Sequence, residues 1–153
     1  KIEGEPGYGK QNPLHIHPPA FPKQETVIKS FPEVKAVAEI QNSILLLALD
    51  KTSPNQGKQF IQSFFDHPKF STVEIVIVLE GHVDLTNISI VMWKFLNNID
   101  PKRDFHFEGE RLGIDATKTF REEGYQQNWP EEIEMTAEIK TKVDNKWDNL
   151  FKG

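Results

Sequence analysis

Three side chains that could transfer protons follow the most apolar segment of the chain. Glu80, His82 and Asp84 come directly after residues 75–79, which read Ile-Val-Ile-Val-Leu. Open α/β sheets bind their ligands at the carboxyl ends of such strands. A carboxylate and a histidine held together can serve as acid and base. The sequence therefore predicts a candidate polar cleft at Glu80, His82 and Asp84.

A simpler interpretation of the same residues is that Asp84 or Thr86 caps the next helix, while Glu80 and His82 are solvated. We favour it, because every helix start needs a cap. The chain also has no Gly-x-Ser-x-Gly elbow, and nothing selects two groups with opposed environments. We therefore assign no catalytic residue.

Two motifs near the N-terminus resemble ligand sites and fall short of them. Residues 4–11 nearly match a phosphate-binding loop, but Gln11 stands where Ser or Thr should hold magnesium. His15 and His17 could chelate a metal, yet no third ligand is suitably spaced. We assign no cofactor-binding and no metal-binding residue.

Composition limits the classes of protein to consider. The 153 residues include 18 basic and 23 acidic side chains, with a net charge of −5, so nucleic acid is a poor partner. There is no cysteine, which excludes thiol chemistry and fits a reducing, cytoplasmic location. The apolar runs are too short for a transmembrane segment. The first residue is not Met, so we expect a piece of a longer polypeptide.

Apolar segments predict the strands. Residues 34–40 and 43–49 suit an antiparallel hairpin. Residues 73–79 are rich in β-branched side chains and suit a central strand. A short strand is expected at residues 105–107, and residues 109–131 are expected to form a loop.

Three helices are expected. The first begins with Ser53 as its N-cap, Pro54 at the first helical position and Gln56 completing a capping box. The others cover about residues 86–98 and 136–150, where apolar side chains recur at helical spacing.

The alternation of strands and helices predicts an α/β fold. We expect a mostly parallel sheet with an antiparallel edge hairpin, flanked by about three helices. Residues 1–32 contain six prolines and are expected to be an extended linker or arm. Residues 33–153 would then form one α/β domain.

The helix at residues 86–98 is apolar on two sides. Ile90 and Trp93 lie off its main apolar stripe, so a second face needs cover. The last helix has its own stripe, which includes Trp147. We predict Ile90, Trp93 and Trp147 as interface residues.

Several short segments follow one another in an order that is typical of a known family. They are Val83-Asp84, Trp93, Asp100-Pro101-Lys102-Arg103-Asp104, Gly113-Ile114-Asp115-Ala116-Thr117-Lys118, Trp129-Pro130 and Trp147. With them, about four-fifths of the chain resembles the C-terminal domain of the UbiD family of prenylated-flavin-dependent decarboxylases. The chain departs from that pattern at Gly81 and His82, which interrupt an acidic run, and at Asn98, where the family usually has Arg. The connection between Asp104 and Leu112 is also shorter than usual.

The resemblance implies that catalysis and subunit assembly belong to different domains of such enzymes. Such enzymes are lyases that remove CO2 from aromatic or α,β-unsaturated acids without oxidation, and some act in ubiquinone or menaquinone biosynthesis. Their prenylated FMN, divalent metal ion and catalytic residues lie in upstream domains. The C-terminal domain joins subunits into a homo-oligomer, a dimer or higher, and closes over the substrate. We therefore expect this chain alone to be inactive and to bind no cofactor.

Two other hypotheses remain. The chain could be a stand-alone α/β binding or assembly module, or a small enzyme that uses Glu80, His82 and Asp84. The apolar second face of the helix at residues 86–98 motivates the first, and the polar cleft motivates the second.

Overall fold

A five-stranded mixed sheet organises the chain in the computed structural model, which describes residues 21–41, 43–126, 129 and 135–151. The strand order is β1-β2-β3-β5-β4. The strands are β1 Val34–Ile40, β2 Ile44–Leu49, β3 Ile75–Glu80, β4 Phe105–Glu108 and β5 Arg111–Asp115. The central three are parallel, and β1 and β4 pair antiparallel at the two edges. This confirms the expected α/β fold with its antiparallel edge hairpin.

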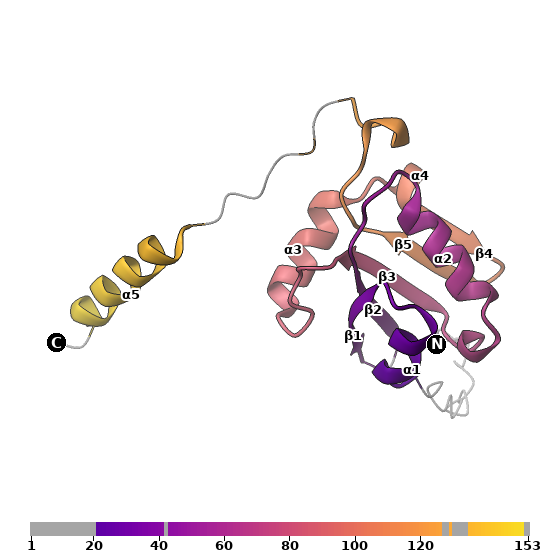
Figure 1. Cartoon of the computed structure of the whole chain (residues 1–153), viewed down its shortest axis with the longest axis horizontal. Helices are drawn as coiled ribbons and strands as arrows, with labels where there is room; N and C mark the ends of the chain where they lie inside the picture. The colour runs from indigo at the N-terminus through magenta and orange to yellow at the C-terminus, as the bar shows by residue number, and fades with distance from the viewer. Residues whose placement is uncertain (1–20, 42, 127–128, 130–134, 152–153) are drawn as a thin grey trace, which may run out of the picture.

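Helices cover both faces of the sheet. They are α1 Gln24–Ser30, α2 Gln56–Asp66, α3 Ile88–Asn98, the single turn α4 Pro101–Asp104 and α5 Ala137–Phe151, with 3-10 turns η1 Pro68–Phe70 and η2 Arg121–Glu123. α1 and α2 lie on one face and α3 on the other, whereas α5 stands apart from the sheet (Figure 1). Within the described residues, we find no helix of the length and apolarity that crossing a membrane requires.

An aromatic cluster fills the core on the α1 and α2 side. Phe31, Phe60, Phe64 and Phe70 are all buried there, and the rings of Phe64 and Phe70 stack with centroids 4.6 Å apart. Offset aromatic pairs of this kind contribute about 0.5–1.5 kcal/mol beyond the area that they bury. This cluster fixes α1 and α2 on the sheet.

The second core lies between the sheet and α3. Leu46, Ile77, Leu79 and Ile114 meet Val91 of α3, and all five are buried. Alternate residues of β2 and β3 thus enter different cores. Because both faces are covered, these strands read as continuous apolar runs.

Two expectations about the elements are wrong. Residues 24–30 form α1, not extended chain, and residues 111–115 form β5, not a loop. Gly113 and the charged ends of β5 conceal its strand pattern. A Cβ atom at Gly113 would lie 2.2 Å from Cγ2 of Ile61, so the close packing of α2 explains this glycine.

Helix α2 begins later than the capping box predicted. Asn55 has a left-handed backbone (φ 61°), and the first helical residue is Gln56. The Gln56 side chain accepts hydrogen bonds from the backbone N–H groups of Thr52 (2.7 Å) and Ser53 (3.3 Å). Ser53 is therefore not the N-cap, although one half of the predicted box is present.

Arg111 fastens β5 to the end of α2. Its guanidinium donates hydrogen bonds to the carbonyl oxygens of Phe65 (2.8 Å), Phe70 (3.0 Å) and Val73 (3.0 Å). It also lies 4.0 Å from the centroid of the Phe65 ring, a cation–π contact. The Arg111 side chain thus provides hydrogen-bond donors for three carbonyl oxygens that lie at or after the ends of α2 and η1.

Candidate functional site

Polar side chains gather at the carboxyl ends of the parallel strands β2 and β3. They surround a pocket of about 290 Å³. Its lining residues are Leu49, Asp50, Lys51, Thr52, Glu80, Gly81, His82 and Lys118. This is the edge at which open α/β sheets bind ligands, so it is the best candidate site in the described part of the chain.

The centre of this edge is a buried ion-pair triad. The Lys51 ammonium lies 2.6 Å from Oε1 of Glu123 and 3.2 Å from Oδ2 of Asp115. The Lys51 side chain is only 2% exposed, and both carboxylates are nearly as buried. A buried charge of this kind is tolerated when it is paired, and Lys51 has two partners.

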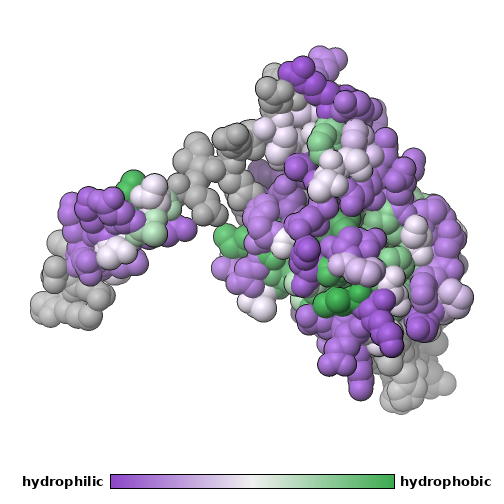
Figure 2. Space-filling view, in the orientation of Figure 1, coloured by the Kyte–Doolittle hydropathy of each residue, from purple (hydrophilic) through white to green (hydrophobic). Residues whose placement is uncertain are grey.

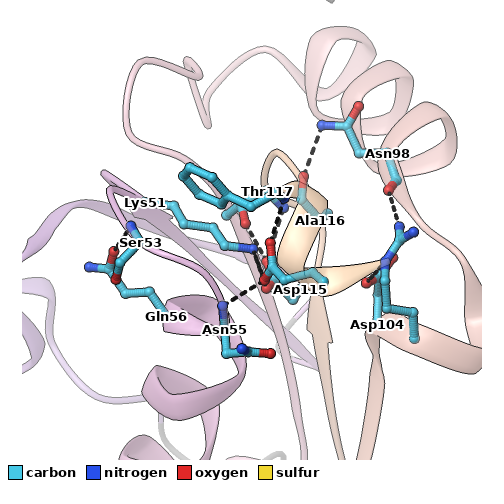
Figure 3. Close-up of polar contacts among 12 residues, drawn as sticks. Lys51, Ser53, Asn55, Gln56, Asn98, Asp104, Asp115, Ala116 and Thr117 are labelled. Atoms are coloured by element: carbon cyan, nitrogen blue, oxygen red, sulfur yellow. Dashed lines mark hydrogen bonds and ion pairs between the residues drawn. The ribbon is translucent and has the colours of Figure 1, made fainter. Parts of the chain in front are cut away.

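Hydrogen bonds fix both carboxylates of the triad. Asp115 accepts bonds from the backbone N–H and the hydroxyl of Thr117. Glu123 accepts bonds from the backbone N–H groups of Asn55 (2.8 Å) and Phe120 (2.6 Å). Figure 3 shows Asp115 between Lys51 and Thr117. The triad therefore joins the end of β2, the end of β5 and the start of α2.

The pKa of Glu123 reflects this environment. Burial raises it, but the hydrogen bond from Lys51 and those from Phe120 and Asn55 outweigh burial and leave the pKa below its ordinary value. Glu123 therefore carries its negative charge at neutral pH, as its pairing with Lys51 requires.

The structure brings two of the three predicted cleft residues together. Glu80 and His82 line the pocket, and Asp84 does not. Oε2 of Glu80 lies 3.4 Å from the ammonium of Lys94, a buried lysine of α3. Glu80 thus pairs with α3 across the second core.

Asp84 closes a turn, and it does not cap the helix. Its carboxylate accepts bonds from the backbone N–H (2.9 Å) and the hydroxyl (2.6 Å) of Thr86, and these bonds lower its pKa. The N-cap of α3 is Asn87, whose side chain accepts a bond from the N–H of Ile90. The expectation that Asp84 or Thr86 caps this helix is therefore wrong. A catalytic role for Glu80, His82 and Asp84 stays a prediction.

Gly81 holds the two sides of the pocket together. A Cβ atom there would lie 1.9 Å from Oδ1 of Asp50. The loop after β3 therefore packs closely on the loop after β2, and a side chain at position 81 would require Asp50 to move. This gives a local reason for Gly81 in a segment where the related family is usually acidic.

The lining of the pocket differs from that of most cofactor sites. Such sites are lined mostly by apolar and aromatic side chains, whereas the lining here is mostly charged or polar, with Leu49 as its apolar member. Lys51, which could meet a phosphate, is committed to two carboxylates. Within the described residues, no three His, Asp or Glu side chains are grouped to hold a metal ion. His15 and His17, like residues 4–11, lie outside the described residues.

The Asp-Pro-Lys-Arg-Asp segment, residues 100–104, forms a short hydrogen-bonded turn that we call the Asp100–Asp104 bracket. Asp100 caps α4 by accepting a bond from the N–H of Lys102, and Asp104 accepts one from the N–H of Asp100 (2.7 Å). Arg103 binds both carboxylate oxygens of Asp104, at 2.6 and 2.7 Å. It also reaches the carbonyl oxygen of Asn98 at the end of α3. The segment thus turns the chain sharply from α3 into β4.

Asn98, just before the Asp100–Asp104 bracket, adds a hydrogen bond between α3 and the chain after β5. Its side-chain amide donates a bond of 3.0 Å to the carbonyl oxygen of Ala116, just after β5 (Figure 3). Asn98 is buried, so the bond ties the end of α3 to the end of β5.

The predicted interface residues are all exposed. The exposed fraction is 42% for Ile90, 56% for Trp93 and 62% for Trp147. Ile88 and Leu96, which belong to the main apolar stripe of α3, are exposed as well, so apolar side chains of both the stripe and the second side meet solvent in this chain (Figure 2). Their role in an interface stays a prediction.

The sequence did not reveal the triad. Lys51 was visible only as a polar residue after an apolar strand, and Glu123 lay in a segment expected to be a loop. Because β5 was not predicted, nothing in the sequence indicated that Asp115 lies at the same edge of the sheet as Lys51.

Comparisons with known proteins agree with this architecture. Residues 19–126 match the family model of the 3-octaprenyl-4-hydroxybenzoate carboxy-lyase C-terminal domain. The chain is 30% identical over 127 residues to an uncharacterized protein of Archaeoglobus fulgidus and 35% identical over 125 residues to one of Aquifex aeolicus. Each match covers 71% of this chain and 26% of the relative. The chain thus spans about a quarter of the length of these relatives.

Solved structures share the fold. Vanillic acid decarboxylase of Sedimentibacter hydroxybenzoicus in its open form superposes with a TM-score of 0.63 at 17% identity, over 84% of this chain and 32% of that one. An evolved dimeric form of the UbiD-class enzyme HmfF from Pelotomaculum thermopropionicum, in complex with prFMN, gives 0.61 at 22% identity, over 80% and 28%. Because the family model covers more than two-thirds of the residues, the chain belongs to the family of 3-octaprenyl-4-hydroxybenzoate carboxy-lyase C-terminal domains, the UbiD family.

Proposed function

We propose that this chain is the C-terminal domain of a UbiD-like decarboxylase that acts on aromatic or α,β-unsaturated carboxylic acids without oxidation. Its role there is to join subunits and to close over the active site. The prenylated FMN, a divalent metal ion and the catalytic residues belong to upstream domains of the same polypeptide. A cytoplasmic location, a role in quinone biosynthesis and a homo-oligomeric state are parts of the same proposal.

One observation carries this proposal: the family-motif residues Asp100, Arg103, Asp104 and Asp115 are bound within the domain. Asp115 holds Lys51, Asp104 holds Arg103, and Asp100 caps α4. Groups committed in this way stabilise a fold and are poorly placed to react with a substrate. This supports a structural role for these four residues, with the chemistry of the family supplied by upstream domains.

The solved relatives support the closing role. Vanillic acid decarboxylase of Sedimentibacter hydroxybenzoicus has been solved in an open and in a closed form, and this chain superposes on both with a TM-score of 0.63. A domain that moves as one body must be internally braced. The Lys51 triad and the Asp100–Asp104 bracket supply such bracing.

The size of the natural polypeptide tests the proposal. An antibody against this domain should detect a band far larger than 17.6 kDa in extracts of the source cells. The purified chain should show no flavin absorbance and no decarboxylation of aromatic acids. A natural band at 17.6 kDa, or turnover by the purified chain, would contradict the proposal.

The second candidate is a stand-alone assembly module. The exposed apolar side chains of α3 and α5 favour it, since both helices offer contact surfaces. A natural band at 17.6 kDa together with self-association of the chain would support this candidate over the first.

A further inference from the structure

Three of the four Asp, Glu and Lys side chains that line the pocket at the carboxyl ends of β2 and β3 are already paired. Asp50 lies 3.5 Å from a lysine ammonium of β1, and Glu80 lies 3.4 Å from one of α3. Lys51 contacts the two carboxylates of its triad. The fourth side chain is Lys118, whose role in the domain is so far unexplained.

Lys118 has no carboxylate partner among the described residues. Its ammonium instead lies 5.3 Å from the centroid of the Phe120 ring, a cation–π contact that helps to stabilise a partly desolvated cation. Lys118 is partly buried, although lysine is mostly exposed unless it is paired. An anion in the pocket would supply the counter-charge that the fold does not.

The backbone that carries Lys118 is fixed beside the pocket. Thr117, the preceding residue, donates hydrogen bonds from its backbone N–H and its hydroxyl to Asp115. Thr117 is buried, and Asp115 is itself held by Lys51. Because the Lys118 side chain starts from this buried turn, little backbone freedom is lost when its ammonium meets a ligand.

We propose that this pocket binds a small monocarboxylate, with the Lys118 ammonium as its counter-charge. One ammonium matches one negative charge, whereas Asp50 and Glu80 in the same lining would repel the second charge of a phosphate dianion. The volume of about 290 Å³ lies at the lower end of the range for ligand pockets, about 300–1,000 Å³. The ligand is therefore an acid of about the size of one ring.

The site goes beyond the function proposed above, which places the substrate and the catalytic groups in upstream domains. It requires neither flavin nor catalysis, and its ligand binds to this domain by itself. Asp115 and Lys118 belong to the same family-motif segment, residues 113–118. Asp115 stabilises the fold, and Lys118 binds the ligand.

Titration of the purified chain with sodium benzoate, followed by NMR, tests the site. The backbone amide resonances of Thr52, Gly81 and Lys118 should shift saturably, because these residues line the pocket. The resonance of Phe107, on the edge strand β4, should not shift. Benzamide, which has the same ring and no charge, should bind at least about tenfold more weakly, and inorganic phosphate should also bind more weakly than benzoate.

Variants of Lys118 separate its charge from general effects. Lys118→Met removes the ammonium and should weaken benzoate binding at least about tenfold, whereas Lys118→Arg keeps the charge and should retain binding. The matched control is Lys69→Met, which removes the same charge from an exposed position before β3, at the opposite edge of the sheet. K69M should bind benzoate like the original chain. Should K118M fail to fold by circular dichroism, the comparison of benzoate with benzamide on the unmodified chain decides.

Three results would overturn the monocarboxylate site. They are the absence of saturable shifts with benzoate, binding of benzamide or phosphate as tight as that of benzoate, and a folded K118M chain that binds benzoate like the original. None of them bears on the size of the natural polypeptide. The proposed decarboxylase domain can therefore stand while the monocarboxylate site fails.

Discussion

Gly57 of α2 and Asp115 of β5 are in such close contact that a Cβ atom on Gly57 would lie 2.1 Å from Oδ2 of Asp115. The first turn of α2 therefore rests directly on the carboxylate that Lys51 neutralises. A negative charge at a helix start is favourable, because the N–H groups there carry partial positive charge. The position of α2 on the sheet therefore depends on Asp115, which is a member of the Lys51 triad.

Replacing Gly57 with Ala should destabilise the fold, although alanine favours a helix by about 1 kcal/mol. The added methyl must displace Asp115 or α2, and overpacking of this kind costs about 1–3 kcal/mol. Urea unfolding should show a lower midpoint with an unchanged slope. Ser63→Ala, at an exposed position of the same helix, should change the free energy of unfolding by less than about 0.5 kcal/mol. A G57A chain as stable as the original would contradict the tight contact.

Removing the positive charge of Lys51 should have a larger effect. Lys51→Met leaves two buried carboxylates unpaired, and breaking a buried ion pair in this way costs about 3–5 kcal/mol. In a double-mutant cycle with Glu123→Gln, the two losses should not add, because both changes break the same contact. The control is Lys35→Met, since Lys35 pairs with Asp50 in an exposed bridge that is worth at most about 1 kcal/mol. Equal effects of K51M and K35M would contradict the role of the triad.

The lowered pKa of Glu123 predicts a particular dependence of stability on pH. A carboxyl group with a lower pKa in the folded state stabilises the fold above its unfolded value, 4.5, and this contribution is lost as the pH falls through the folded pKa. The difference in free energy of unfolding between the original chain and Glu123→Gln should therefore be constant near pH 7 and shrink below pH 4.5. Urea titrations between pH 7 and pH 3 measure it. A difference that stays constant across this range would show that Glu123 does not titrate as the pairing requires.

Asn98 should be sensitive to truncation. Asn98→Ala leaves the carbonyl oxygen of Ala116 without its partner, and a buried polar group left unsatisfied costs about 1–3 kcal/mol. Asn97→Ala provides the comparison, since Asn97 is exposed and bonds only within its own helix. Thermal unfolding should place N98A well below N97A. Equal melting temperatures would argue against the bracket between α3 and β5.

The central strands and the long helices could be predicted from the sequence because their patterns are local. The apolar runs that became β2 and β3 and the stripe of α2 need no distant partner to be recognised. β5 could not be found in this way, since Gly113 is explained only by its contact with Ile61. The Lys51–Glu123 pair joins residues far apart in the chain, and no local pattern reports such a contact.

Glu123 also fixes the point at which the last part of the chain leaves the sheet. Its bonds to Lys51 and to the backbone N–H of Asn55 hold residues 121–123 at the carboxyl edge of the sheet. The chain therefore departs from the same edge as the candidate pocket, which Lys51 also lines. One carboxylate thus sets the exit point of everything that follows η2.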